Sequence, residues 1–136
     1  MDVHNKTTRS YNMSRIKAKD TKPEILVRKF LFSHGFRYRI HVKNLIGKPD
    51  IVLAKYVTII FIHGCFWHAH EGCKYYAVPK TNTAFWINKL QGNKQRDDEN
   101  FSKLALSGWK IITIFECELK AETLNQTLSN LLDELH

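Results

Sequence analysis

The sequence predicts a single α/β domain, in which helices flank a mixed β-sheet in the order αβββαβα. Its 136 residues suit one domain. Two apolar runs, 50–54 and 57–63, are separated by two residues only, which favours a β-hairpin. A further β-rich run, 109–115, follows a long helical segment. A hairpin followed by a helix and one more strand indicates a sheet with antiparallel and parallel pairing, covered by helices on both faces.

The first helix is expected to begin at Thr21, because Thr21 and Glu24 fit a capping box and Pro23 suits the first turn. Gly35 is placed to end this helix in a left-handed cap. The strictly alternating run 36–42 then predicts a half-buried strand, the first of four. Two more helices are expected over 82–107 and 122–135.

Basic residues outnumber acidic ones by 21 to 13, and the net charge of +8 favours a polyanionic partner such as DNA. Charge alone leaves an ordinary basic protein open. Residues 1–20 are interpreted as a basic arm that contacts DNA, since such a segment can lie along phosphates. Neither an apolar run of the ~20 residues that span a membrane nor a signal peptide is recognised. We therefore expect a soluble, cytoplasmic protein without a membrane partner.

Asp50 opens the second strand of the predicted sheet, where an edge carboxylate can hold a hard cation. The third strand ends at His63, and His68 lies five residues further along. Because adjacent hairpin strands bring the end of one near the start of the other, Asp50 and His63 could meet. A metal-holding carboxylate and a histidine are what metal-assisted phosphodiester hydrolysis needs. A plain strand-start aspartate is the alternative for Asp50 alone.

Three cysteines and a histidine have the composition of a closed tetrahedral zinc site. Cys65, His70 and Cys73 share the long irregular segment 64–80, and Cys117 follows the last strand. An odd number of cysteines in an intracellular chain argues against a disulfide framework. Reduced thiols beside a surface histidine are the alternative that the pattern leaves open.

Three aromatic residues, Phe66, Trp67 and Trp86, are candidates for contact with bases. Apolar wedges unstack base steps at a cost that is lower at a mismatch. Each of these aromatics alone fits a core position better. Adjacent Phe66 and Trp67 are harder to bury, however, in a loop already rich in polar ligands.

Beyond these patterns, the chain resembles the very-short-patch repair endonucleases, whose core is that of the PD-(D/E)xK nucleases. Phe61-Ile62-His63 stands where most PD-(D/E)xK nucleases carry Glu-x-Lys, and this departure marks the very-short-patch enzymes. The likeness runs along nearly the whole chain and is carried by Thr8-Arg9-Ser10, Asn12-Met13, Asp20-Thr21 with Glu24, Gly47-Lys48-Pro49-Asp50, His63-Gly64-Cys65-Phe66-Trp67-His68, Val78-Pro79-Lys80-Thr81-Asn82-Thr83, Phe85-Trp86, Lys89, Asn93, Arg96-Asp97, Gly108-Trp109 and Glu116-Cys117.

The resemblance implies a role for each residue of the candidate active site. Asp50 would bridge Mg²⁺ ions, and the backbone carbonyl of Ile62 would add a ligand. His68 would be the general base, with Glu24 orienting it through a hydrogen bond. His63 would contact the scissile phosphate.

The resemblance also implies supporting and DNA-contacting residues. Asn93 and Asp97 would support the site, and the zinc held by the Cys/His set would be structural. Phe66, Trp67 and Trp86 would intercalate from the major groove beside a T:G mismatch, and Met13 would approach from the minor groove.

The resemblance, added to the patterns above, implies a monomeric, Mg²⁺-dependent DNA endonuclease. It would nick one strand 5′ of the T in T:G mismatches, in very short patch repair of deaminated 5-methylcytosine. Duplex DNA with a T:G mismatch is the expected partner, and mismatch-repair proteins are further candidates. Two alternatives remain at this point: another PD-(D/E)xK nuclease of the restriction or homing kind, and a non-catalytic zinc-containing DNA-binding module.

Overall fold

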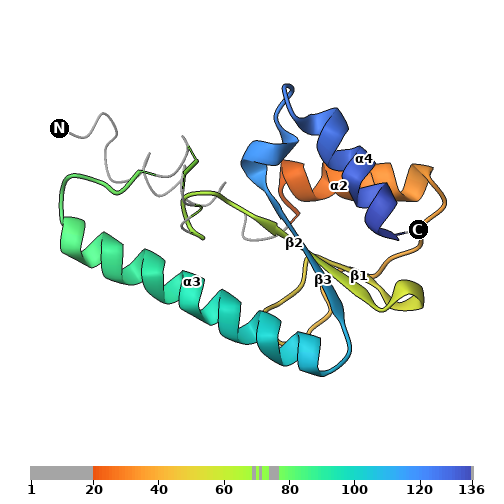
Figure 1. Cartoon of the computed structure of the whole chain (residues 1–136), viewed down its shortest axis with the longest axis horizontal. Helices are drawn as coiled ribbons and strands as arrows, with labels where there is room; N and C mark the ends of the chain where they lie inside the picture. The colour runs from red at the N-terminus through yellow and green to blue at the C-terminus, as the bar shows by residue number, and fades with distance from the viewer. Residues whose placement is uncertain (1–19, 69, 71, 74–76, 136) are drawn as a thin grey trace, which may run out of the picture.

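The computed structural model describes residues 20–68, 70, 72–73 and 77–135, so the predicted arm and Met13 lie outside the described residues. No helix in this part of the chain is long and apolar enough to cross a membrane. The elements, shown in Figure 1, are α2 (Lys22–Ser33), β1 (Ile51–Leu53), a 3-10 turn (Ala54–Tyr56), β2 (Thr58–His63), α3 (Thr83–Leu106), β3 (Lys110–Phe115), a second 3-10 turn (Glu116–Leu119) and α4 (Leu124–Leu135).

The described strands form one mixed sheet in the order β1-β2-β3. β1 and β2 pair antiparallel, with Ile51 opposite Ile60. β2 and β3 pair parallel over six residues, from Thr58 with Lys110 to His63 with Phe115. The predicted hairpin and the mixed pairing are therefore confirmed.

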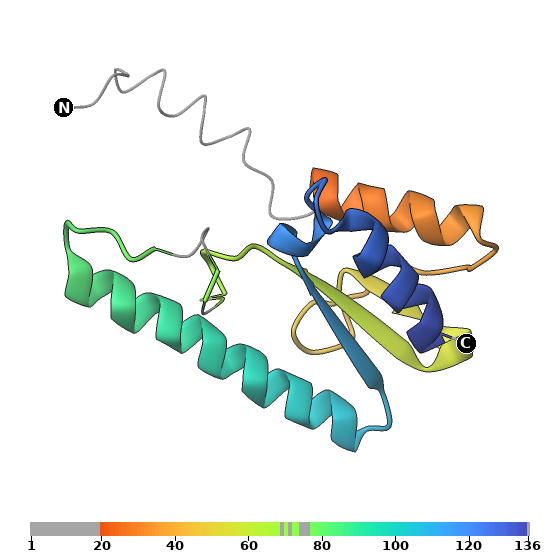
Figure 2. The ribbon, with the colours of Figure 1, turned by 45° about the horizontal axis from the view of Figure 1, so that its top comes forward.

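Helices cover both faces of this sheet, α2 and α4 on one and α3 on the other (Figure 2). Side chains alternate along β2, so Ile60 and Ile62 pack toward α2 and α4 while Ile59 and Phe61 pack toward α3. A strand covered on both faces buries every side chain, which explains why β2 is apolar from Ile59 to Ile62.

The predicted first strand, 36–42, is wrong in extent. Only Arg39 pairs with the sheet, through two 2.9 Å backbone hydrogen bonds with Val52. His41 adopts a left-handed backbone (φ 56°), which ends extended pairing, and its Nε2 lies 3.0 Å from Asp20. The alternating pattern instead reflects Phe36 and Tyr38 packing into the core from an irregular segment. The described order is therefore αββαβα.

The ends of α2 show one prediction confirmed and one corrected. Gly35 (φ 85°) follows α2, and the N–H groups of Gly35 and Phe36 bond back to Phe32 and Leu31, as in a Schellman motif. The capping box is wrong, because the Thr21 hydroxyl donates to the Glu24 side chain, which itself accepts from the backbone N–H of Asp20. The Glu24 carboxylate thus belongs to a side-chain cluster.

Candidate active site and candidate metal centre

Asp50 lies immediately before β1, beside the end of β2. Its Oδ2 accepts a 2.6 Å hydrogen bond from the backbone N–H of Ile62, and its own N–H donates to the Ile60 carbonyl. The carboxylate therefore has a fixed position at this edge of the sheet. Asp50 and Ile62, which the sequence predicts as cation ligands, are direct neighbours.

The surroundings of Asp50 oppose its negative charge. Burial raises the pKa of Asp50 to about 7, against an opposing effect of the Ile62 N–H. The charge of Glu24 also raises this pKa, and that of Arg28 lowers it. A divalent cation at this position would supply the missing compensation.

Two histidines stack where β2 runs into the following loop. The rings of His63 and His68 lie 3.6 Å apart at an interplanar angle of 5°. His63 is buried, and its ring also contacts Phe101 of α3 and Phe115 of β3. Burial, with repulsion from His68, lowers the pKa of His63 to about 4, although Asp97 acts in the opposite direction. His63 is therefore neutral at physiological pH.

His68 is oriented by α3. Its Nδ1 lies 2.5 Å from Oδ2 of Asp97. A carboxylate can only accept at this distance, so Nδ1 carries the proton and Nε2 is the basic atom of the neutral ring. This is the arrangement by which a carboxylate positions a histidine as a general base.

The two histidines and Asp97 border a cavity of about 340 Å³ between the loop, α3 and β3. The uncharged residues Phe101 and Thr113 line part of it, and the charged residues Lys94 and Asp98 also line it. The cavity places the histidine pair where a ligand can reach it.

Glu24 does not hold His68, contrary to the predicted role. Its carboxylate accepts from Arg28, Thr21 and the Asp20 N–H, and Asp97 takes the partnership with His68. Glu24 lies on α2, which covers the opposite face of the sheet from α3, the helix that carries Asp97.

The candidate cation ligand also stands apart from the histidines. In the described part of the chain, His63, His68 and Asp97 form a group with ligand atoms within 4.8 Å of one another, and Asp50 does not join it. Sequence reasoning missed the buried Arg28. Its spacing of four residues from Glu24 on one helix was an available signal.

Asn93 and Asp97 lie one turn apart on α3 and both hold the loop. Asn93 Nδ2 donates to the Trp67 carbonyl at 3.0 Å, and Arg96 in turn donates to Asn93 Oδ1 at 2.7 Å. Residues four apart share a helix face, so one face of α3 contacts the loop at Trp67 and His68.

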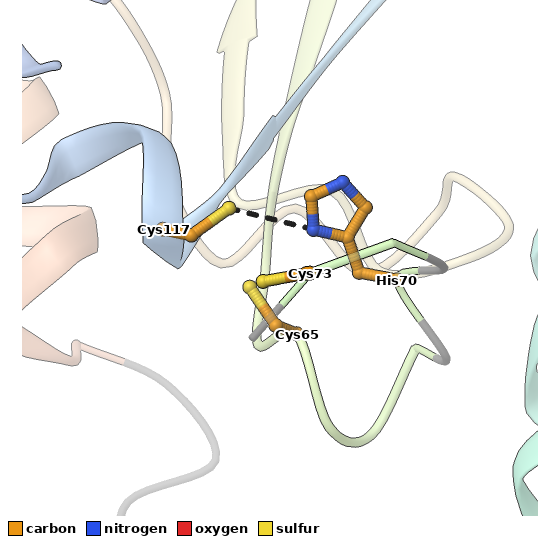
Figure 3. A group of neighbouring side chains, drawn as sticks. All are labelled: Cys65, His70, Cys73 and Cys117. Atoms are coloured by element: carbon orange, nitrogen blue, oxygen red, sulfur yellow. Dashed lines mark hydrogen bonds between the residues drawn. The ribbon is translucent and has the colours of Figure 1, made fainter. Parts of the chain in front are cut away.

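The four predicted zinc ligands converge on one point (Figure 3). Cys65, His70 and Cys73 come from the loop and Cys117 from the turn after β3, and their ligand atoms all lie within 4.8 Å of one another. Cys117 Sγ lies 3.4 Å from His70 Nδ1. A tetrahedral zinc ion would hold a sulfur and a nitrogen about 3.6 Å apart, so the donor set and its spacing fit zinc.

The loop backbone and the thiol environment agree with this assignment. The His70 N–H donates to the Cys65 carbonyl at 2.9 Å, which folds the loop back on itself. Burial and the neighbouring thiols raise the pKa of Cys117 to about 12. The Cys117 thiol stays protonated without a cation, and metal binding would release its proton.

The three predicted intercalating aromatics form one cluster between the loop and the start of α3. Ring centroids lie 5.0 Å apart for Phe66 and Trp67, 5.7 Å for Phe66 and Trp86, and 6.0 Å for Trp67 and Trp86. Trp67 is 49% exposed. Phe85, which sequence reasoning did not select, contacts Trp86 and is 59% exposed. The cluster therefore presents aromatic surface to solvent.

A basic α/β domain that carries a carboxylate-held histidine and a buried carboxylate of raised pKa has components that a metal-assisted nuclease needs. Comparisons with known proteins specify the class further.

A sequence model of the DNA mismatch endonuclease Vsr family matches residues 1–74. The type II nicking enzyme V.NmeAIP of Neisseria meningitidis is 48% identical over 135 residues, covering 98% of this chain and 96% of that protein. The type II nicking enzyme V.XorIIP of Xanthomonas oryzae is 40% identical over 126 residues, 92% of each chain. The DNA mismatch endonuclease Vsr of Escherichia coli is 38% identical over 135 residues, covering 98% and 86%. The chain belongs to the Vsr family of DNA mismatch endonucleases.

The environment of Asp50 predicts a pH-dependent effect of Asp50→Asn. The folded-state pKa of about 7 exceeds the ordinary value of 3.8, so this carboxyl disfavours folding increasingly as pH rises from about 4 through 7. In magnesium-free buffer at pH 8, Asp50→Asn should raise the free energy of unfolding, by at most about 4 kcal/mol. Near pH 4 the difference should vanish. Urea unfolding at both pH values measures it.

Asp98→Asn, on the same helix as Asp97 but exposed, is the control and should show no such pH dependence. Equal stability of wild type and Asp50→Asn at pH 8 would contradict the described environment of Asp50.

Proposed function

We propose that this chain is a Mg²⁺-dependent endonuclease that nicks one strand of duplex DNA 5′ of the T in T:G mismatches, in repair of deaminated 5-methylcytosine. The observation that carries the proposal is the histidine pair at the cavity, with His68 held by Asp97. Membership of the Vsr family and the name of the Escherichia coli relative support the mismatch substrate.

Asp50 and the backbone carbonyl of Ile62 would hold the cation. The donor set fits, because Mg²⁺ binds proteins through one or two carboxylates and otherwise keeps water and substrate phosphate oxygens. The raised pKa of Asp50 marks a carboxylate whose charge lacks compensation. When bound, Mg²⁺ offsets charge on the phosphate and makes a bound water more acidic.

The side chains at the cavity would move the proton. Nε2 of His68 accepts a proton from the attacking water, and the carboxylate of Asp97 stabilises the imidazolium that forms. His63 is neutral, so it can donate one N–H to a non-bridging phosphate oxygen.

The aromatic cluster would distinguish mismatched from matched DNA. Phe66, Trp67 and Trp86 are already in contact and partly exposed, so they need no rearrangement of the domain to enter a base step. Unstacking costs a few kcal/mol per step, and less at a mismatch. That difference is the proposed source of discrimination.

Zinc at the Cys65, His70, Cys73 and Cys117 site would be structural, since four protein ligands leave no open coordination position. The ion would tie the loop that carries His68 and two of the aromatics to the end of β3. Its contribution to the nicking reaction is therefore indirect.

The zinc assignment predicts that Cys117→Ala loses the ion and destabilises the fold. Structural zinc contributes folding free energy directly, so the melting temperature should fall by roughly 10 °C or more in this small domain. Elemental analysis of the purified variant measures the metal. One equivalent of zinc in Cys117→Ala would refute the ligand set.

The mismatch assignment predicts strand-specific nicking of labelled duplexes that carry T:G, and no nicking of matched T:A. Nicking should need Mg²⁺, and Asp50→Ala should lower the rate by at least ~10³-fold, because the cation ligand is lost. Substrates must cover varied flanking sequences.

Each other outcome points to a different protein class. Equal cutting of T:A would leave a nuclease of the restriction or homing kind. Binding of T:G without cutting in any context would favour a non-catalytic DNA-binding module.

A further inference from the structure

His70 borders both candidate sites of the molecule. Its Nδ1 lies 3.4 Å from Cys117 Sγ, so this nitrogen is the one that the Cys/His set offers to zinc. The same side chain lines the cavity of about 340 Å³ that His63 and His68 also line. One imidazole thus belongs to the candidate metal centre and to the candidate active site.

The second nitrogen of this ring, Nε2, has no hydrogen-bond acceptor in the described part of the chain. Figure 3 shows Nε2 on the side of the ring away from the sulfur atoms. Zinc bound at Nδ1 leaves the proton of the neutral ring on Nε2, which is then a donor. Zinc-bound histidines almost always donate this second N–H to an acceptor beyond the metal ligands. We therefore looked for an acceptor that comes from outside the domain.

Phe115 fixes the plane of the His70 ring. The two rings stack with centroids 3.8 Å apart and an interplanar angle of 6°. The same phenyl ring meets His63 at an angle of 76°, with centroids 5.7 Å apart. Because Nδ1 faces Cys117 and one ring face is covered, Nε2 is the only polar ring atom of His70 left for the cavity. A donor that is already fixed loses little entropy when it binds an acceptor.

A phosphate oxygen of DNA is the acceptor that fits this cavity. The chain belongs to a family of DNA endonucleases, and at least half of the hydrogen bonds between proteins and DNA go to phosphate and sugar oxygens. Three thiolates on one zinc ion leave a net negative charge, so the attraction comes from the N–H and not from the metal centre. Lys94 also lines the cavity and favours an anion there, whereas Asp98 opposes it. The contact is thus expected to contribute one hydrogen bond to a charged group, about 10-fold in affinity.

We propose that His70 binds DNA as well as zinc, and that its Nε2–H donates a hydrogen bond to one phosphate oxygen of the strand that enters the cavity. Zinc supports this contact because it holds the ring and keeps the proton on Nε2. The inference deepens the proposed function and rests on it for the substrate, duplex DNA, but not for the cleavage reaction.

Two variants separate the phosphate contact from zinc binding. His70→Cys supplies a fourth thiolate, which can still close a tetrahedral zinc site but has no N–H for the cavity. The swap variant, His70→Cys with Cys73→His, keeps three thiolates and one imidazole, and hence the charge of the metal centre, but moves the imidazole to another position. His34→Cys, at an exposed histidine directly after α2, is the matched control.

Zinc content is measured by elemental analysis, and affinity for a T:G duplex is measured in magnesium-free buffer, where no nicking is expected. Both His70 variants should hold one equivalent of zinc and bind the duplex about 10-fold more weakly than the wild type. The control should change neither value. Wild-type affinity in the zinc-loaded swap variant would overturn the proposal.

Replacing one phosphate at a time with an uncharged methylphosphonate locates the contact. At one phosphate, the replacement should cost the wild type about 10-fold more affinity than it costs the swap variant, because the swap variant has already lost the contact. At the other phosphates the two proteins should respond equally. A zinc ligand with a purely structural role would give no such position, and that result would also overturn the proposal.

NMR of the histidine ring N–H groups in the zinc-loaded wild type decides the matter if neither variant holds zinc. The Nε2–H signal of His70 should shift downfield and exchange more slowly with water when the duplex is added, and an unchanged signal would contradict the proposal. If the wild type binds the duplex but nicks it in no context, the proposed reaction fails, and the binding measurements still decide whether His70 contacts a phosphate.

Discussion

The hydrogen bond between His68 and Asp97 is the contact on which the arrangement of the candidate active site depends. His68 lies on an irregular loop, and a loop alone cannot keep an imidazole in one orientation. α3 supplies the constraint, with Asp97 holding the ring and Asn93 holding the backbone one residue earlier. The Cys/His cluster ties the other half of the same loop to the end of β3. The helix α3 thus determines the position of His68, although His68 lies on the loop.

The sheet links the functional parts of the molecule. β2 has apolar neighbours on both faces, and its last residue is His63, two positions before Cys65. Asp50 lies directly before β1, and its carboxylate lies beside Ile62 of β2. Phe115 at the end of β3 stacks on the candidate zinc ligand His70 and touches His63. One aromatic ring therefore lies between the candidate metal centre and the histidine pair.

Much of this arrangement was predictable from the sequence, because periodicity and glycine positions determine local structure. The hairpin, the long helix before Gly108 and the convergence of Cys65 with Cys117 all appear as predicted. The alternating pattern of residues 36–42 predicted a strand, but the structure has a single bridge at Arg39. The pattern could not show this, because it carries no signal for the left-handed backbone of His41. The resemblance assigned Glu24 as the partner of His68. Residue patterns could not correct this assignment, because they do not show which face of the sheet a helix covers.

The most direct test of the central claim, that Asp97 makes His68 a general base, is the single-turnover nicking rate of Asp97→Asn on a T:G duplex at saturating Mg²⁺. Asparagine keeps the shape but no longer fixes the proton on Nδ1 or stabilises the imidazolium. The rate should fall by about 10²-fold or more, with unchanged affinity for the duplex. A rate equal to that of the wild type would contradict the account.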